Sequence, residues 1–368
     1  MTSRERFLAA VLHKEADRVP IFANISGPIA HALGTEMGLP YESVPSYLSS
    51  RISYTEVLLQ LGNDAVGVGF TRDGLKQHAH DDAGQQDEWG FSYEKVGDYL
   101  EITERPLSSA VTVEEIDYYR MPDTTNDKSW EHARRMIEAY RDEYYIVGCM
   151  GQTMFETAWN LVGFERFLMD FYTEQPYVLR LLDRLLKFAK DCGHRLIDLG
   201  VDALWTGDDV GTQEGMLISP DVWRSILKPR LGELYQSYRQ KNPDIKIIYH
   251  SCGSIVPIIS DLIEIGVDIL NPIQPLAKDM DLYKLKGIHG GSLSFFGGVD
   301  VQEVMPKGSI ADIENHVRDR IQAAAKGGGF IIAPAHVIQP DTAVTNVKAF
   351  FNAVKKYGTY PIGDTAGV

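Results

Sequence analysis

The stretch from residue 203 to 250 reads ALWTGDDVGTQEGMLISPDVWRSILKPRLGELYQSYRQKNPDIKIIYH, and it decides the expected fold. Two short apolar runs, at 203–206 and 246–250, enclose an amphipathic segment at 219–241 that is typical of a surface helix. Strand, helix and strand in this order predict two parallel strands that are joined by a covering helix.

The same alternation extends in both directions along the chain. Eight apolar runs are expected as strands, at residues 18–24, 64–69, 145–150, 203–206, 246–250, 268–271, 293–297 and 328–333. Amphipathic segments such as 163–198 and 309–326 lie between them. Eight strand–helix repeats predict an α/β fold with a closed (β/α)8 TIM-like barrel, and an open doubly wound sheet is the alternative.

The length of the chain and the breaks in the strand–helix alternation indicate the domain organisation. Because a single barrel can reach about 400 residues with insertions, we expect one barrel domain over residues 1–368. The polar stretch 71–125 is expected as an insertion after the second strand, with a hairpin at 89–91. Residues 3–14 predict a first helix that is capped by Ser3.

The composition excludes several classes of protein. The chain has a formal net charge of −15 and lacks a dense run of Lys and Arg, which disfavours nucleic-acid binding. Its three cysteines are too few for a disulfide framework, and no apolar run is long enough for a membrane helix. We therefore expect a cytoplasmic protein that contacts neither nucleic acid nor membrane, and a homo-oligomer remains one alternative.

Known phosphate-binding and nucleophile motifs are missing from the sequence. We find no GxGxxG after the first expected strand, no GxxxxGK loop and no GxSxG elbow. These absences disfavour dinucleotide-dependent, nucleotide-hydrolysing and serine-hydrolase activities.

The most informative chemistry follows the fifth expected strand. Active sites of barrels lie at the carboxyl ends of the strands, where this run ends in His250-Ser-Cys252. Residues two apart on an extended chain point to the same face. Imidazole nitrogen and thiolate sulfur are preferred ligands of Zn²⁺. The pair predicts a zinc site, and the alternative is a buried structural cysteine beside a histidine.

A third ligand is expected from the end of the eighth strand. The run there continues into Ala333-Pro-Ala-His336, and His336 could meet the pair across the barrel mouth. Three protein ligands with an open fourth position are the pattern of a catalytic zinc. Gln339 lies three residues further on and is a candidate for substrate binding.

Acidic side chains follow two other strands. Asp208 and Asp209 come after the fourth strand, where either is a candidate general base, metal ligand or helix cap. We expect one of them to be functional and the other structural, without a choice between them. Glu156 lies in the first turns of a helix after the third strand, so helix capping is the alternative to a catalytic role.

Polar and aromatic side chains at the remaining strand ends are candidates for substrate binding. Asn271 and Gln274 end the sixth run, and Asp300 ends the seventh. Trp159 is an aromatic residue near the expected mouth, and packing is the alternative to contact with a ring-bearing substrate.

Taken together, these blocks resemble the uroporphyrinogen decarboxylase superfamily over nearly the whole chain. The resemblance rests on residues 3–7, 17–20, 217–220, 250–253, 262–268, 271–275, 297–300 and 333–336. It implies a TIM-like barrel, which agrees with the count of expected strands.

The superfamily holds two main activities. True decarboxylases carry a Met-Arg-Gln-Ala-Gly-Arg stretch for porphyrinogen carboxylates, whereas the equivalent segment 24–28 has no arginine here. The cobamide-dependent methyltransferases resemble this chain in their His-X-Cys zinc ligands, here His250 and Cys252. Their later cysteine is replaced in the region of Ala335-His336. The third ligand therefore stays open between His336, Glu156 and none.

The resemblance implies a zinc-dependent methyltransferase of the O-demethylase type. It would move a methyl group from a small methylated or methoxylated substrate to a corrinoid on a partner protein. Asp208 or Glu156 would manage protons. The alternatives are a metal-free carboxy-lyase that uses Asp208 and Asp209, and a non-catalytic tetrapyrrole or corrinoid binder.

Overall fold

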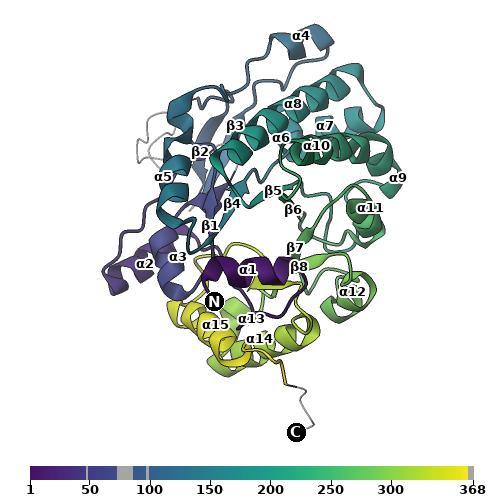
Figure 1. The fold of residues 1–368 in the computed structure, drawn as a ribbon. Helices are drawn as coiled ribbons and strands as arrows, with labels where there is room; N and C mark the ends of the chain where they lie inside the picture. Colours follow the sequence, from purple (N-terminus) through teal and green to yellow (C-terminus); the bar gives the residue numbers. More distant parts are fainter. Residues whose placement is uncertain (47–48, 73–85, 97–98, 364–368) are drawn as a thin grey trace.

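Seven parallel strands form the central sheet of the computed structural model, which describes residues 1–46, 49–72, 86–96 and 99–363. The strands follow one another in chain order around the curled sheet (Figure 1). Their bounds are β1 (Ala65–Val68), β4 (Tyr145–Cys149), β5 (Ala203–Gly207), β6 (Lys246–His250), β7 (Ile269–Ile273), β8 (Ser294–Val299) and β9 (Phe330–Pro334). Each is parallel to its neighbours, as the strand–helix alternation predicted.

The first expected strand, 18–24, lies in the gap between β9 and β1. Ile21 forms a parallel bridge with Ile332 of β9, and its carbonyl oxygen accepts a hydrogen bond of 2.7 Å from the Asp64 amide before β1. The segment is bridged at single points rather than along a regular ladder, because Pro20 offers no amide hydrogen. The expected α/β fold with a TIM-like barrel is confirmed.

Helices cover the outside of the strands (Figure 1). They are α2 (Gly27–Met37), α3 (Thr55–Leu61), α5 (Glu131–Tyr140), α6 (Phe155–Val162), α7 (Phe164–Tyr172), α8 (Pro176–Leu199), α9 (Pro220–Val222), α10 (Lys228–Lys241), α11 (Ile259–Glu264), α12 (Leu282–His289), α13 (Val304–Lys307), α14 (Ile310–Ala324) and α15 (Val344–Tyr357). The longest helix, α8, buries a stripe of leucines that recurs at helical spacing. This agrees with the amphipathic segment that was expected at residues 163–198.

The expected insertion contains a hairpin, but at a different place from the one that the sequence indicated. The strands β2 (Ser92–Val96) and β3 (Tyr99–Glu104) pair antiparallel, and α4 (Val113–Tyr118) follows. The residues 89–91 instead form a tight turn, because the Asp87 carboxylate accepts hydrogen bonds from the amides of Trp89 and Phe91. The hairpin prediction at 89–91 was therefore wrong by a few residues. Residues 73–85 of the insertion lie outside the described part of the chain.

Alternate residues of the strands fill the barrel interior. The buried inner cluster includes Ala65, Tyr145, Val147, Cys149, Ala203, Trp205, Ile248, Ile269, Phe296, Ile331 and Ala333. Since side chains two apart share a face, this parity also places His250 after Ile248 and Asn271 after Ile269 on the inner side. The sequence thus directs both polar side chains into the barrel at the carboxyl ends of their strands.

Two glycines of β1 and its end, Gly67 and Gly69, share the inner face with Ala65. A Cβ atom on Gly67 would lie 2.2 Å from the carbonyl oxygen of Arg51, and one on Gly69 would lie 3.4 Å from Ile52. Glycine is therefore needed at residue 67 for the close approach of another backbone segment. This packing holds the short 3₁₀ turn η1 (Ser50–Ile52) against the inner face of β1.

The helix α1 (Ser3–Val11) lies across the end of the barrel that is opposite to the carboxyl ends of the strands (Figure 1). Its N-cap is Thr2 rather than the expected Ser3. The Thr2 hydroxyl accepts from the Glu5 amide, and the Glu5 carboxylate accepts from the Thr2 amide, which completes a capping box. Phe7 stacks on Tyr145 at 4.4 Å and closes this end of the core.

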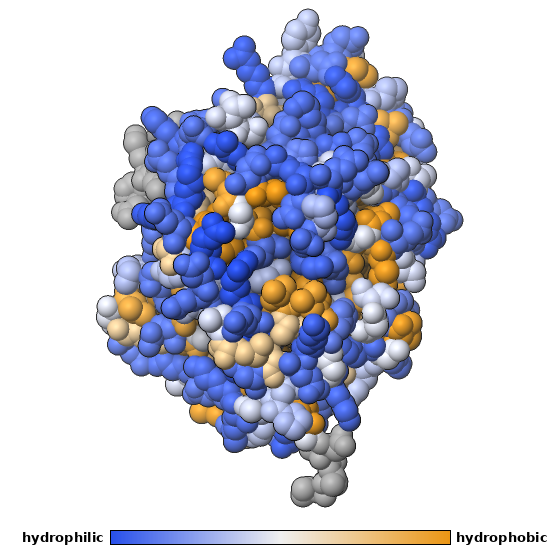
Figure 2. Space-filling model, in the orientation of Figure 1, coloured by the Kyte–Doolittle hydropathy of each residue, from blue (hydrophilic) through white to orange (hydrophobic). Residues whose placement is uncertain are grey.

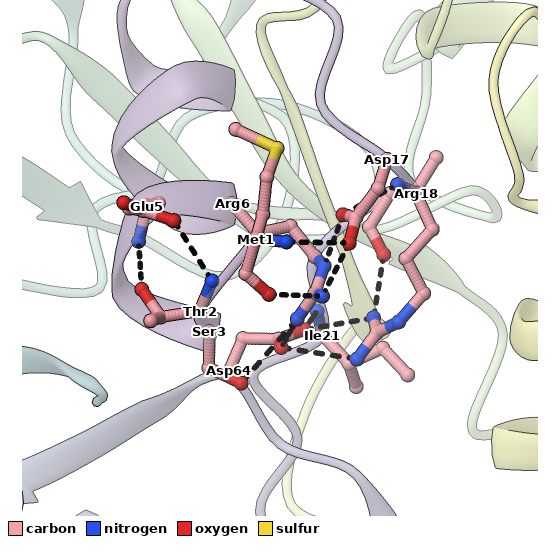
Figure 3. Close-up of polar contacts among 10 residues, drawn as sticks. Met1, Thr2, Ser3, Glu5, Arg6, Asp17, Arg18, Ile21 and Asp64 are labelled. Atoms are coloured by element: carbon pink, nitrogen blue, oxygen red, sulfur yellow. Dashed lines mark hydrogen bonds and ion pairs between the residues drawn. The ribbon is translucent and has the colours of Figure 1, made fainter.

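A buried ion-pair network fixes the same end (Figure 3). The side chain of Asp64 is fully buried and receives hydrogen bonds from Arg6 at 2.6 Å, from Arg18 at 2.8 Å and from the Ile21 amide at 2.8 Å. Arg6 also forms two hydrogen bonds to Asp17, at 2.6 and 2.7 Å. The motif residues 3–7 and 17–20 therefore have a structural role far from the carboxyl ends of the strands.

The surface around α1 is mixed in character. Figure 2 shows hydrophilic side chains over most of the periphery of this face, with hydrophobic side chains gathered nearer its centre. Among the helices of the described residues, none is long and apolar enough to cross a bilayer.

Candidate metal centre

Three ligand-bearing side chains converge at the carboxyl ends of β5 and β6. Ligand atoms of Asp209, His250 and Cys252 all lie within 4.8 Å of one another. The His250 Nε2 atom is 3.5 Å from Asp209 Oδ1 and 3.7 Å from Cys252 Sγ. The parallel register pairs Gly207 with His250, so the residues after β5 lie beside the end of β6.

Asn271 on the neighbouring strand β7 orients the His250 ring. The Asn271 Oδ1 atom is 2.7 Å from His250 Nδ1, while its Nδ2 donates to the Phe296 carbonyl oxygen at 3.3 Å. Because the amide nitrogen is already used, the amide oxygen faces the ring and Nδ1 carries the hydrogen. Burial lowers the pKa of His250, which keeps the ring neutral. The Nε2 lone pair is therefore available toward Asp209 and Cys252.

The backbone around Cys252 ties the three side chains together. The Cys252 amide donates to Asp209 Oδ1 at 2.7 Å, and the Asp209 amide donates to Glu156 Oε2 at 3.0 Å. The Gly253 amide donates to Gln274 Oε1 at 2.8 Å, which holds the loop after Cys252. These backbone hydrogen bonds hold the Cys252 thiol and the Asp209 carboxylate next to each other.

Acidic groups are crowded together at this centre. Burial raises the pKa of the Cys252 thiol, and the neighbouring Asp209 and Glu156 raise it further. Burial also raises the pKa of Glu156, and the charges of Asp209 and Asp208 add to this. A divalent cation among these groups would stabilise the thiolate and the carboxylates together.

Asp208 faces away from the three ligands and serves the start of α6. Its buried carboxylate accepts hydrogen bonds from the amides of Thr153, Met154 and Glu156, at 3.0 to 3.1 Å. Burial raises the pKa of Asp208 to about 7, and these backbone hydrogen bonds oppose the shift. The structure thus separates the two adjacent acids, because only Asp209 joins the group with His250 and Cys252.

His336 does not belong to this group of three within the described residues. Burial lowers the pKa of His336, and the positive charge of Arg51 lowers it further. The charge of His336 also acts on the pKa of His250. These interactions place His336 in the mouth beside the centre.

Three other predicted residues have local partners. Asp300 is buried and accepts hydrogen bonds from the amides of residues 302, 303 and 304, so it caps the turn into α13. Trp159 packs edge-on against Phe155 at 5.1 Å and Phe164 at 5.3 Å. Gln339 donates to the carbonyl oxygen of Val337 at 3.4 Å. Their proposed contact with substrate stays a prediction.

Arg51 is a site residue that the sequence reasoning missed. Its guanidinium carbon lies 3.9 Å from the centroid of the Trp205 ring, inside the barrel mouth. Its charge acts on the pKa values of His250, Cys252 and His336. The signal that was available is the pair Gly67 and Gly69 on one face of a strand, which indicates close approach of another segment.

The donor set fits zinc. One imidazole nitrogen, one thiolate sulfur and one carboxylate oxygen are ligands that Zn²⁺ accepts, and three protein ligands leave a position for substrate. The hydrogen bond from His250 to Asn271 is the kind of outer contact that fixes a zinc-bound histidine.

The chain belongs to a known protein family. Residues 101–357 match the model of the uroporphyrinogen decarboxylase (URO-D) family, so the chain belongs to that family. It is similar to two curated proteins named methylcobamide:CoM methyltransferase MtaA. One is from Methanosarcina barkeri, with 23% identity over 198 residues, and the other is from its strain Fusaro / DSM 804, with 22%. The chain spans about half the length of these relatives, 54% in each case.

A solved structure matches over almost the whole chain. It is a methyltransferase from Methanosarcina mazei, with 21% identity, a TM-score of 0.72, and coverage of 97% of this chain and 99% of that one. This similarity shows a shared fold. The resemblance to the methyltransferase-like branch of the family is confirmed.

Proposed function

We propose that this protein is a zinc-dependent methyltransferase that moves a methyl group from a small methylated or methoxylated substrate to a corrinoid carried by a partner protein. The observation that carries the proposal is the convergence of Asp209, His250 and Cys252 at the carboxyl ends of the strands. The similarity to proteins named for methylcobamide supports a corrinoid as one of the two partners in the methyl transfer.

In this proposal, Asp209, His250 and Cys252 hold the zinc ion, and Asp209 takes the place of the third ligand that was first expected to be His336. A bound zinc ion supplies Lewis acidity toward an ether oxygen or a thiol sulfur. Asn271 keeps the His250 Nε2 lone pair directed at the centre, and Gln274 holds the loop after Cys252.

The two neighbouring acids have separate tasks. Glu156 holds a proton next to the centre, because burial and the surrounding negative charge raise its pKa. Asp208 positions the start of α6, and through it the backbone of Glu156. The corrinoid partner would dock over the mouth, where the substrate's methyl group faces outward.

A methyl-donor screen tests this function. Reduced corrinoid, free and on a corrinoid protein, is mixed with the zinc-loaded protein and a panel of methoxylated and methylated compounds. We expect at least one compound to convert the cobalt(I) spectrum to that of methylcobalt(III). His250→Ala, which lacks one of the three proposed zinc ligands, is expected to slow the conversion by roughly 1,000-fold. Absence of conversion with every compound, or an unchanged rate in His250→Ala, would contradict the proposal.

A further inference from the structure

Arg51 holds a guanidinium group in the barrel mouth, where no other described residue forms an ion pair with it. Its guanidinium carbon lies over the face of the Trp205 ring, 3.9 Å from the ring centroid. Across the described ranges, no carboxylate lies within ion-pair distance of Arg51 and none of its guanidinium nitrogens donates a hydrogen bond. Burial lowers the pKa of Arg51 to about 10, so the group is still charged at neutral pH.

Other buried or half-buried arginines of the protein differ in this respect. Arg6 and Arg18 both pair with Asp64, and Arg230 pairs with Asp183 at 2.8 Å. A desolvated charge is costly unless a counter-charge and hydrogen bonds compensate it. Arg51 therefore lacks the counter-charge that the other arginines have.

The sequence places Arg51 there by a specific device. A Cβ atom on residue 67 would lie only 2.2 Å from the carbonyl oxygen of Arg51. Only glycine at position 67 therefore allows the turn η1 to pack inside the barrel. The Trp205 ring, on the inner face of β5, then supports one face of the guanidinium. A stacked guanidinium keeps its N–H groups free at the edge, in the planar fork that matches a carboxylate.

The charges around the metal centre suggest a role for the Arg51 guanidinium in substrate binding. The carboxylate of Asp209 places negative charge at the metal centre, which would repel an anionic substrate. Arg51 is the cation that acts on the pKa values of both His250 and Cys252. One positive charge suits a small molecule with one oxyanion rather than a porphyrinogen with many carboxylates.

We propose that Arg51 binds an oxyanion of the substrate, a carboxylate or a sulfonate, and so selects small anionic methyl donors. This inference rests on the proposed function, because it names the substrate class of that same site. It adds a substrate-binding residue on η1, a segment that contributes no ligand to the metal centre.

Binding measurements with matched probes test the inference. The probes are the ω-methoxy carboxylates from methoxyacetate to 5-methoxypentanoate, 4-methoxybenzoate, the corresponding sulfonates, and the amide of each carboxylate, which has the same shape without charge. Isothermal titration calorimetry is run on zinc-free and zinc-loaded protein. We expect at least one acid to bind wild type more tightly than its amide, on the order of 10- to 100-fold.

Three variants make the result specific. Arg51→Gln is expected to abolish the preference for the anion, and Arg51→Lys to retain part of it. Arg135→Gln, which removes an exposed arginine that pairs with Glu42 on the outer surface, should leave the preference unchanged. Circular dichroism and the unfolding midpoint show whether each variant is folded. If Arg51→Gln does not fold, Arg51→Lys is used to test the preference for the anion.

The outcomes separate this inference from the proposed function. If no acid binds better than its amide, or if the preference survives in folded Arg51→Gln, Arg51 does not select an anion. If wild type holds no zinc but prefers the acids through Arg51, the inference stands as an anion site and the methyltransferase proposal fails. If the zinc-loaded protein converts the cobalt(I) spectrum but does not prefer any acid over its amide, the inference about Arg51 fails and the methyltransferase proposal stands.

Discussion

Replacement of His250 by alanine is expected to lower the bound zinc from about one ion per chain to near zero. Cys252→Ser should have the same effect, because it removes the sulfur ligand. Asp209→Asn should weaken zinc binding, because it removes the negative charge of the third ligand while it keeps an oxygen atom. Methyl transfer should fall by roughly 1,000-fold in each of the first two variants, since Lewis-acid stabilisation amounts to several kcal/mol. Zinc is measured by inductively coupled plasma mass spectrometry after gel filtration.

Two control variants distinguish ligand loss from general damage. Cys192→Ser removes another thiol, which is buried in α8, and His31→Ala removes an exposed imidazole. Both controls should keep the wild-type zinc content. If the ligand variants and the controls hold equal amounts of zinc, the metal centre is not at these residues.

Replacement of Asp64 by alanine should lower the free energy of unfolding by about 3–5 kcal/mol, the usual cost of breaking a buried ion pair. The fully buried carboxylate is the partner of both Arg6 and Arg18 and also receives the Ile21 amide. Its loss would leave two guanidinium groups uncompensated and would loosen the segment that joins β9 to β1. Urea unfolding followed by circular dichroism measures the effect.

Asp17→Ala is the matched control for this network. Asp17 also pairs with Arg6, at 2.6 Å, but its side chain is 42% exposed. Because water screens exposed pairs, the expected loss is about 1 kcal/mol or less. Equal losses in the two variants would show that burial of Asp64 does not set the strength of the network.

The barrel could be predicted because its strands are short apolar runs at regular intervals. Seven of the eight expected runs became regular strands, and the eighth, 18–24, joins the ring through single bridges around Pro20. The place of the hairpin could not be read from residues 89–91, because the Asp87 side chain turns the chain there before the strands begin.

The metal centre was partly predictable. The two-residue spacing of His250 and Cys252 indicated a shared face, and strand parity explains why that face is the inner one. The choice between Asp208 and Asp209 depends on which carboxylate meets the amides of residues 153–156, and the sequence pattern holds no record of that contact.

Arg51 lay beyond the reach of strand-end reasoning. It lies on a turn between expected elements, and its entry into the barrel depends on a backbone contact with Gly67. The absence of arginine from residues 24–28 therefore gave an incomplete account of the charge in the mouth, because a more distant segment supplies it.

The most direct test of the central claim is zinc K-edge X-ray absorption of the zinc-loaded protein. We expect one zinc–sulfur distance of about 2.3 Å, with the remaining ligands at about 2.0–2.2 Å as nitrogen or oxygen. In Cys252→Ser the sulfur contribution should disappear, while Cys192→Ser should retain it. A spectrum of wild type without sulfur, or one that Cys252→Ser leaves unchanged, would contradict a metal centre formed by Asp209, His250 and Cys252.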